Sequence, residues 1–198
     1  MRKLTLIFSI LLFTLNVFSQ RVLGRYPIHH SRAVSGWIGL DLWYEMNDAS
    51  GNIVESVIGD DAVNTGATYG ATGKVGDALD FEESEDDYIT MGTGFNYGSA
   101  DFSITCWVNL ESTGDQSVCG GLLNSFFFNI RSTGALSAGK TNVLECTPTS
   151  TVNVSTGTLT FIGVSYNQST DEFRFRAGSN YETESFTYTF EAATRAIG

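Results

Sequence analysis

The sequence predicts an all-β fold made of antiparallel strands. Three observations support this prediction: short runs in which apolar and polar residues alternate, clusters of Gly, Asn, Asp, Ser and Thr between the runs, and an almost complete lack of helical periodicity. Successive side chains of a strand point to opposite faces, so alternation indicates one buried face and one face in water. Many such strands in one domain-sized chain predict a sandwich or a barrel.

Four runs carry the alternation, in chain order. Leucine, tyrosine and methionine alternate with charged residues and a tryptophan over residues 40–46, and five apolar residues alternate with polar ones and a tryptophan over 102–110. Phenylalanines alternate with arginines over 173–176, and aromatic residues alternate with threonines over 186–190. Turn-forming residues separate the runs, as expected for antiparallel strands.

The first nineteen residues have the layout of a secretory signal peptide. Arg2 and Lys3 form a basic head, residues 4–17 are mostly apolar, and the small residue Ser19 ends the segment. The apolar core is too short for a membrane span, which needs ~20 apolar residues. We therefore expect cleavage after Ser19 and a protein that is secreted or held at the cell surface.

The expected organisation is a signal peptide over 1–19, an irregular basic leader over 20–36, and one domain over 37–198. Removal of the signal leaves 179 residues, in which nine Lys and Arg oppose 22 Asp and Glu, a net charge of −13. Nucleic acid is an unfavourable partner for such a surface, because phosphate binding needs clustered basic residues. No later segment is expected to enter a membrane. The acidity fits solubility, or carboxylates that are open to a hard cation such as calcium.

The three cysteines, Cys106, Cys119 and Cys146, are an odd number for an exported protein. One disulfide and one free thiol could form, and the sequence does not choose among the three pairings. A zinc site is not expected, because the chain has no CxxC spacing and its two histidines, His29 and His30, lie together in the leader.

Several elements of the chain follow one another in a characteristic order. An aromatic strand leads to two small-residue turns, then to a Gly-Lys-x-Gly-x-Ala-x-x-Phe element, an acidic turn ending in Asp-Tyr, and a Phe-Ser-Ile-x-x-Trp-Val strand. These elements are Tyr44, residues 49–51, Glu55-Ser56, residues 73–81, Asp87-Tyr88 and residues 102–108. This order resembles the laminin-G-like, concanavalin A-like jelly-roll family of extracellular modules. The resemblance implies a jelly-roll sandwich of two antiparallel sheets.

A later stretch, residues 157–178, resembles the hairpin that the family has near its end. It departs from the family at Leu159, where Trp is usual, and Glu55 stands where Asp is more common. The family continues past this region into a closing strand, whereas the sequence ends at Gly198. The resemblance therefore implies a domain that lacks its closing strand; a divergent but complete domain is the alternative.

The sequence does not favour an enzyme, although concanavalin A-like folds include glycoside hydrolases. Retaining hydrolysis needs two carboxylates ~5–5.5 Å apart, which these enzymes usually carry on one strand as Glu-x-Asp-x-x-Glu. The acidic run over residues 82–87 does not match that pattern, and it falls on a turn for which Asp is well suited. No nucleophile elbow, Walker loop or His-containing triad is visible.

The resemblance implies binding of sugars or of extracellular proteins, often with a calcium ion near the rim of the sheet. Trp43 and Trp107 lie on the strand faces opposite to the aliphatic residues, so they are candidate platforms for sugar rings. Burial beneath the second sheet or a loop is the alternative for both. Five loop carboxylates are candidate calcium ligands, or else solvated side chains: Asp48, Glu55, Asp60, Asp61 and Asp87.

These expectations converge on an exported, non-catalytic adhesion or carbohydrate-binding module. The alternative is a structural spacer, one repeat of a larger extracellular protein. A glycoside hydrolase-like enzyme is the third hypothesis.

Overall fold

The computed structural model of the chain describes residues 3–5, 42–91, 101–121, 126–141, 144–148, 151–187 and 195–197. Most of the predicted signal peptide, the whole of the predicted leader and the end of the alternating run over 186–190 lie outside these residues. The described part forms fourteen strands and one three-residue 3-10 helix, η1 (Glu83–Glu85). No helix in this part is long or apolar enough to span a bilayer.

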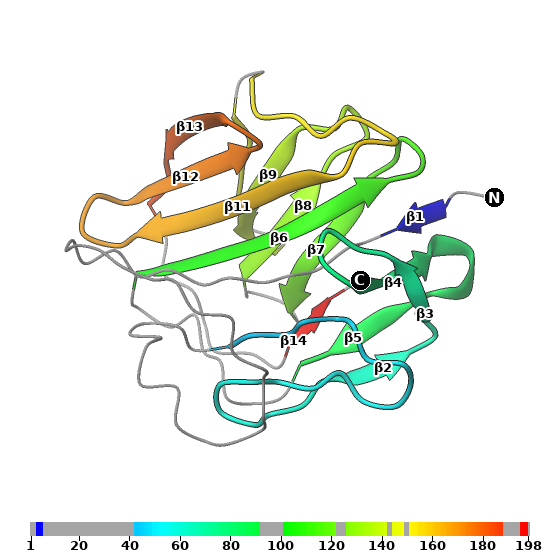
Figure 1. Cartoon of the computed structure of the whole chain (residues 1–198). Coiled ribbons are helices and arrows are strands. Elements are labelled where there is room, and N and C mark those ends of the chain that lie inside the picture. The colour runs from blue at the N-terminus through cyan, green and yellow to red at the C-terminus, as the bar shows by residue number, and fades with distance from the viewer. Residues whose placement is uncertain are drawn as a thin grey trace, which may run out of the picture.

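The strands form two antiparallel sheets (Figure 1). The first sheet has the order β13 (Asn180–Ser185), β12 (Glu172–Ala177), β11 (Thr160–Asn167), β6 (Phe102–Leu110), β1 (Lys3–Thr5), β4 (Asp77–Glu82) and β3 (Thr68–Thr72). The second has the order β10 (Leu144–Cys146), β9 (Leu136–Lys140), β8 (Phe126–Ile130), β7 (Gln116–Gly121), β14 (Arg195–Ile197), β5 (Tyr88–Thr90) and β2 (Val63–Thr65). The prediction of an all-β, antiparallel fold is confirmed.

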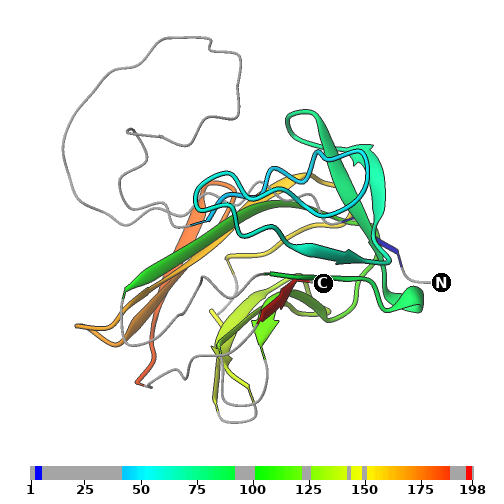
Figure 2. The same cartoon turned by 90° about the horizontal axis from the view of Figure 1, so that it is seen from below.

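The two sheets are the two layers of a sandwich (Figure 2). Their facing side chains meet in an aromatic cluster: Phe102 of the first sheet lies edge-on to Phe126 of the second, with ring centroids 4.9 Å apart. Phe173 of the first sheet lies 6.0 Å from Phe126 by the same measure. Burial of these rings favours folding, since an aromatic side chain removes ~150–250 Å² from water.

The alternation in the sequence predicts which side chains enter this core. Along β6 every second residue from Phe102 to Leu110 is buried, and the residues between them are half-buried on the other face. In β12 the phenylalanines are buried, whereas Arg174 and Arg176 are exposed. Residues 42–46 differ, because Tyr44 makes only an isolated bridge to Glu55 and no continuous strand forms there.

The turn before β4 depends on two glycines. Gly76 has a φ of 70°, the left-handed region that glycine adopts without strain. Gly73 does not lie in this region; a side chain there would clash instead with the carbonyl oxygen of Asp77, 2.6 Å from the Cβ position. After the turn, Leu79 and Phe81 enter the core.

The strand β1 lies inside the first sheet, between β4 and β6. Leu4 is aligned with Phe81 on one side and with Leu110 on the other, and both pairings are antiparallel. β1 thus connects the pair formed by β3 and β4 to the four strands β6, β11, β12 and β13 (Figure 1).

Candidate functional site

Aromatic and basic side chains gather on the outer face of the first sheet. We call this surface the Trp107 face and define it by Trp107 on β6, Phe161 on β11, Arg174 and Arg176 on β12, Tyr181 on β13, and Lys74 from the turn between β3 and β4. The register places Phe161 beside Trp107 and Arg176 beside Tyr181. On β6 and β12 these residues alternate with buried ones, so the pleat that builds the core also forms this face.

Cation–π contacts order the Trp107 face. The rings of Trp107 and Phe161 pack edge-on with centroids 5.5 Å apart. The Nζ of Lys74 lies 4.7 Å from the ring centroid of Trp107, and the guanidinium carbon of Arg176 lies 5.3 Å from that of Phe161. Each such contact contributes roughly 0.5–1 kcal/mol at an exposed site. Aromatic rings and cations are therefore held together on one face of the first sheet.

The same face also includes a ring that is largely in water. Tyr181 is 62 % exposed, and the guanidinium carbon of Arg174 lies 4.3 Å from its ring centroid. The Nε of Arg176 donates to the carbonyl oxygen of Gly178 at 2.8 Å, which fixes the orientation of this arginine. The site can thus offer flat apolar surfaces together with positive charge.

The structure separates the two tryptophans that the sequence singles out. Trp107 is half-buried on the outer face of β6, whereas Trp43 is half-buried against the hydrophobic core. The backbone N–H of Trp43 donates to Oε1 of Glu55 at 2.7 Å, so this segment is attached to the loop that follows it. Of the two tryptophans, Trp43 therefore does not belong to the Trp107 face.

Glu55 organises that loop from a buried position. Its side chain is only 3 % exposed, and its two carboxylate oxygens accept four backbone hydrogen bonds of 2.6–2.8 Å. The donors are the N–H groups of Trp43, Val57, Ile58 and Gly59. The carboxylate therefore satisfies the backbone donors of a turn that has no regular secondary structure, as a cap does at a helix end.

The other predicted calcium ligands also contact the backbone. Oδ1 of Asp61 accepts from the N–H of Glu55 at 3.0 Å, and Oδ2 of Asp48 accepts from Val54 at 3.1 Å. The carbonyl oxygen of Asp60, rather than its carboxylate, accepts a bond from the hydroxyl of Tyr44 at 2.9 Å.

Asp87 closes the turn between β4 and β5. Its Oδ2 accepts from the N–H of Glu82 at 2.8 Å, and the preceding residue, Asp86, has a left-handed φ of 56°. The acidic run over 82–87 thus forms the tight turn that the sequence predicts. Within the described residues, no group of three or more His, Cys, Asp or Glu side chains is arranged to hold a metal ion.

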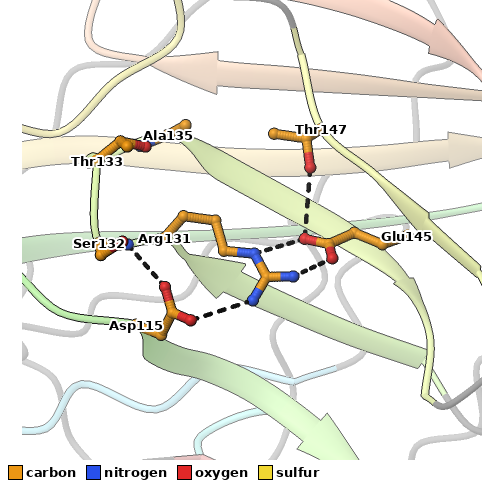
Figure 3. Close-up of polar contacts among 7 residues, drawn as sticks. All are labelled: Asp115, Arg131, Ser132, Thr133, Ala135, Glu145 and Thr147. Carbon is orange, nitrogen blue, oxygen red and sulfur yellow. Dashed lines mark hydrogen bonds and ion pairs between the residues drawn. The ribbon is translucent and has the colours of Figure 1, made fainter.

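A polar network on the second sheet was not indicated by the sequence (Figure 3). Arg131 follows β8 and makes a two-pronged ion pair with Glu145 of β10; its Nη1 also lies 3.4 Å from Oδ2 of Asp115. The N–H of Ser132 donates to the other oxygen of Asp115 at 2.7 Å. These bonds join the ends of three strands, and partial exposure limits each ion pair to ~1 kcal/mol or less.

Cys106, Cys119 and Cys146 form no disulfide with one another, and all three lie in buried positions. Burial raises the pKa of the Cys106 thiol well above its ordinary value, and the nearby Cys119 raises it further. Burial together with the carboxylates of Glu184 and Glu145 raises the pKa of Cys146 to about 11.

These pKa shifts predict a loss of stability in alkali. Below pH 9.0, the ordinary thiol pKa, both folded and unfolded chains keep the Cys146 proton; between pH 9.0 and about 11 only the unfolded chain releases it. The free energy of unfolding should therefore fall by up to about 1.4 kcal/mol per pH unit from this thiol. Urea unfolding at pH 8.5 and pH 10.5 measures the change. Cys146→Ala should show a smaller fall than the unaltered chain, and an equal fall would contradict the assignment.

The sequence pattern could have indicated more of the Trp107 face than Trp107 itself. Arg174 and Arg176 alternate with buried phenylalanines, and Phe161 is aligned with Trp107 once the two strands are paired. The signal missing from the sequence was the register of β6 on β11, which is set by tertiary pairing.

A scan against models of known protein families finds no match to this chain, and a search of curated proteins finds no similar sequence.

Proposed function

We propose that the chain is an exported, non-catalytic binding module of the laminin-G-like, concanavalin A-like jelly-roll type, and that it recognises carbohydrate through the Trp107 face. The observation that carries the proposal is the pairing of the half-buried rings of Trp107 and Phe161 next to Lys74 and Arg176. Aromatic faces stack on the apolar faces of sugar rings. The two-sheet antiparallel architecture is compatible with this family, and the resemblance in the sequence supplies the family itself.

The charge of the Trp107 face favours an acidic carbohydrate. Residues 37–198 contain six basic residues, and three of them, Lys74, Arg174 and Arg176, contribute to this face. Such a local concentration of positive charge in a strongly acidic chain attracts carboxylated or sulfated sugars. Arginine also binds carboxylate and sulfate groups through paired N–H donors.

A glycan array probed with the mature chain, residues 20–198, tests the proposal. We expect binding to carboxylated or sulfated glycans and a loss of at least about tenfold in affinity for Trp107→Ala, since one aromatic–sugar contact resembles other ring-stacking contacts of 1–3 kcal/mol. The matched control is Tyr88→Ala, which removes a ring that is 41 % exposed on β5 of the other sheet.

Three results would contradict the proposal in different ways. Equal affinity for the two variants would place the ligand elsewhere, and a preference for neutral glycans would remove the role of the basic residues. Absence of binding to every glycan, by a monodisperse and folded chain, would leave the structural spacer as the better hypothesis.

Calcium remains a prediction for this module. The array should be repeated with calcium and with a chelator, together with thermal unfolding of the free chain. A calcium-dependent rise in Tm would locate the ion in the folded chain, because a ligand that binds only the folded state stabilises it. Asp60→Asn and Asp61→Asn would then show whether the loop carboxylates hold it.

A further inference from the structure

This inference rests on the proposed export of the chain and concerns the place of β1 in the first sheet, between β4 and β6. Lys3 is aligned with Glu82, Leu4 with both Phe81 and Leu110, and Thr5 with Asn109. Residues 3–5 belong to the predicted signal peptide, so cleavage after Ser19 removes the strand that lies between β4 and β6. The loss would expose backbone groups of two strands in the middle of a sheet, where unpaired N–H and C=O groups are costly.

The strand slot between β4 and β6 sets requirements for any segment that fills it. Its central position is flanked by Phe81 and Leu110, each only 2 % exposed, so the occupant needs an apolar residue there. Its first position is opposite Glu82, at the start of an acidic turn, and favours a basic residue. Its third position is opposite Asn109, which is half-buried and polar.

We propose that the new N-terminus created by signal cleavage fills this slot, with Arg21-Val22-Leu23 taking the place of Lys3-Leu4-Thr5. The replacement keeps a basic residue opposite Glu82 and an apolar β-branched residue, which favours strands, between Phe81 and Leu110. Gln20 would be the only residue before Arg21 in the cleaved chain, so the new N-terminus would lie one residue from the slot.

Other parts of the leader fit the slot less well. Arg25-Tyr26 is followed by Pro27, whose missing N–H is unsuited to a strand that pairs on both sides. Arg32-Ala33 would place only a methyl group between Phe81 and Leu110. The basic character of the leader also complements the acidic turn that η1 forms beside the slot.

The leader is long enough to reach the slot. Residues 24–41 separate Leu23 from the first described residue of the domain, Leu42. Eighteen residues span roughly 60 Å when extended, more than the ~40 Å diameter expected of a domain of this size. Because the segment is tethered to the domain, its local concentration is high and it is favoured over a strand from another molecule.

Hydrogen-exchange mass spectrometry on the mature chain tests the proposal. We expect slow exchange in the peptides that cover β4 and the end of β6. Val22→Asn should accelerate this exchange at least about tenfold, since burial of the asparagine side-chain amide between Phe81 and Leu110 would destabilise the inserted strand. Leu23→Asn is the matched control: the same substitution falls opposite Asn109 and should leave the exchange unchanged. Equal exchange in the two variants would overturn the proposal.

A cross-link provides a second test that does not depend on the stability of the variants. Residues directly opposite in an antiparallel pair have Cα atoms ~4.5–5.5 Å apart, within the range that a disulfide bridges. Arg21→Cys combined with Glu82→Cys should give an intramolecular disulfide, and Arg32→Cys combined with Glu82→Cys should not. A cross-linked dimer would assign the slot to a second copy, and failure to cross-link would assign it to another segment; either result overturns the proposal.

Discussion

Replacement of Phe173 with alanine is expected to lower the free energy of unfolding by about 3–5 kcal/mol, the usual cost of removing a buried ring and leaving a cavity. Phe173 is fully buried, and its ring lies 4.7 Å from that of Phe186 and 5.0 Å from that of Tyr166, measured between centroids. It also contacts Phe126 of the opposite sheet. The cavity would therefore lie at the junction of the two layers, where no single strand can move to fill it.

Equilibrium unfolding in urea measures this change. Tyr181→Ala is the control, because it removes an aromatic ring from the neighbouring strand β13 that is mostly in water, and it should cost less than about 1 kcal/mol. Similar losses for the two variants would show that the aromatic cluster does not join the sheets as described.

Glu55→Gln is expected to lower the free energy of unfolding by about 3–4 kcal/mol although the two side chains have the same shape. The carboxylate of Glu55 accepts four backbone hydrogen bonds, from Trp43 and from residues 57–59. The glutamine amide would keep one acceptor oxygen and turn an NH₂ group toward the remaining backbone donors. Buried donors that lose their partner cost ~1–3 kcal/mol each.

The control for Glu55→Gln is Glu45→Gln. Glu45 makes one exposed hydrogen bond, to the side-chain amide of Asn47, and the substitution should change stability by less than about 0.5 kcal/mol. Unfolding in urea compares the two, and hydrogen exchange over residues 53–60 locates the effect. Glu55→Gln as stable as the unaltered chain would contradict the capping role.

The sequence predicted the strands that carry alternating hydrophobicity and missed those built from small residues. β6 and β12 follow from their alternation, because one face enters the core and the other does not. β9, with the sequence LSAGK, is buried at all five positions, so it has no polar face for a pattern to reveal. Its identity as a strand depends on pairing with β8 and β10, which is a tertiary property.

The candidate site was predicted in part for a similar reason. Trp43 and Trp107 occupy equivalent places in the alternation, but Trp107 lies in a regular strand and Trp43 in a segment attached to the loop around Glu55. Alternation shows which face of a strand a residue occupies and does not show whether a loop covers that face. Likewise, the composition of the acidic loops could not distinguish oxygens that converge on an ion from oxygens that accept backbone hydrogen bonds.

If the chain is exported, as we propose, its three buried thiols make the order of folding and oxidation important. Cys106 and Cys119 belong to different sheets, so they are shielded from oxidants only after the sandwich has closed. In an oxidising compartment the exposed thiols of an unfolded chain could be oxidised or form disulfides, whereas burial shields them in the folded chain. In such a compartment, burial of the thiols would protect them, and the yield of folded protein would depend on whether the sandwich closes before the cysteines are oxidised.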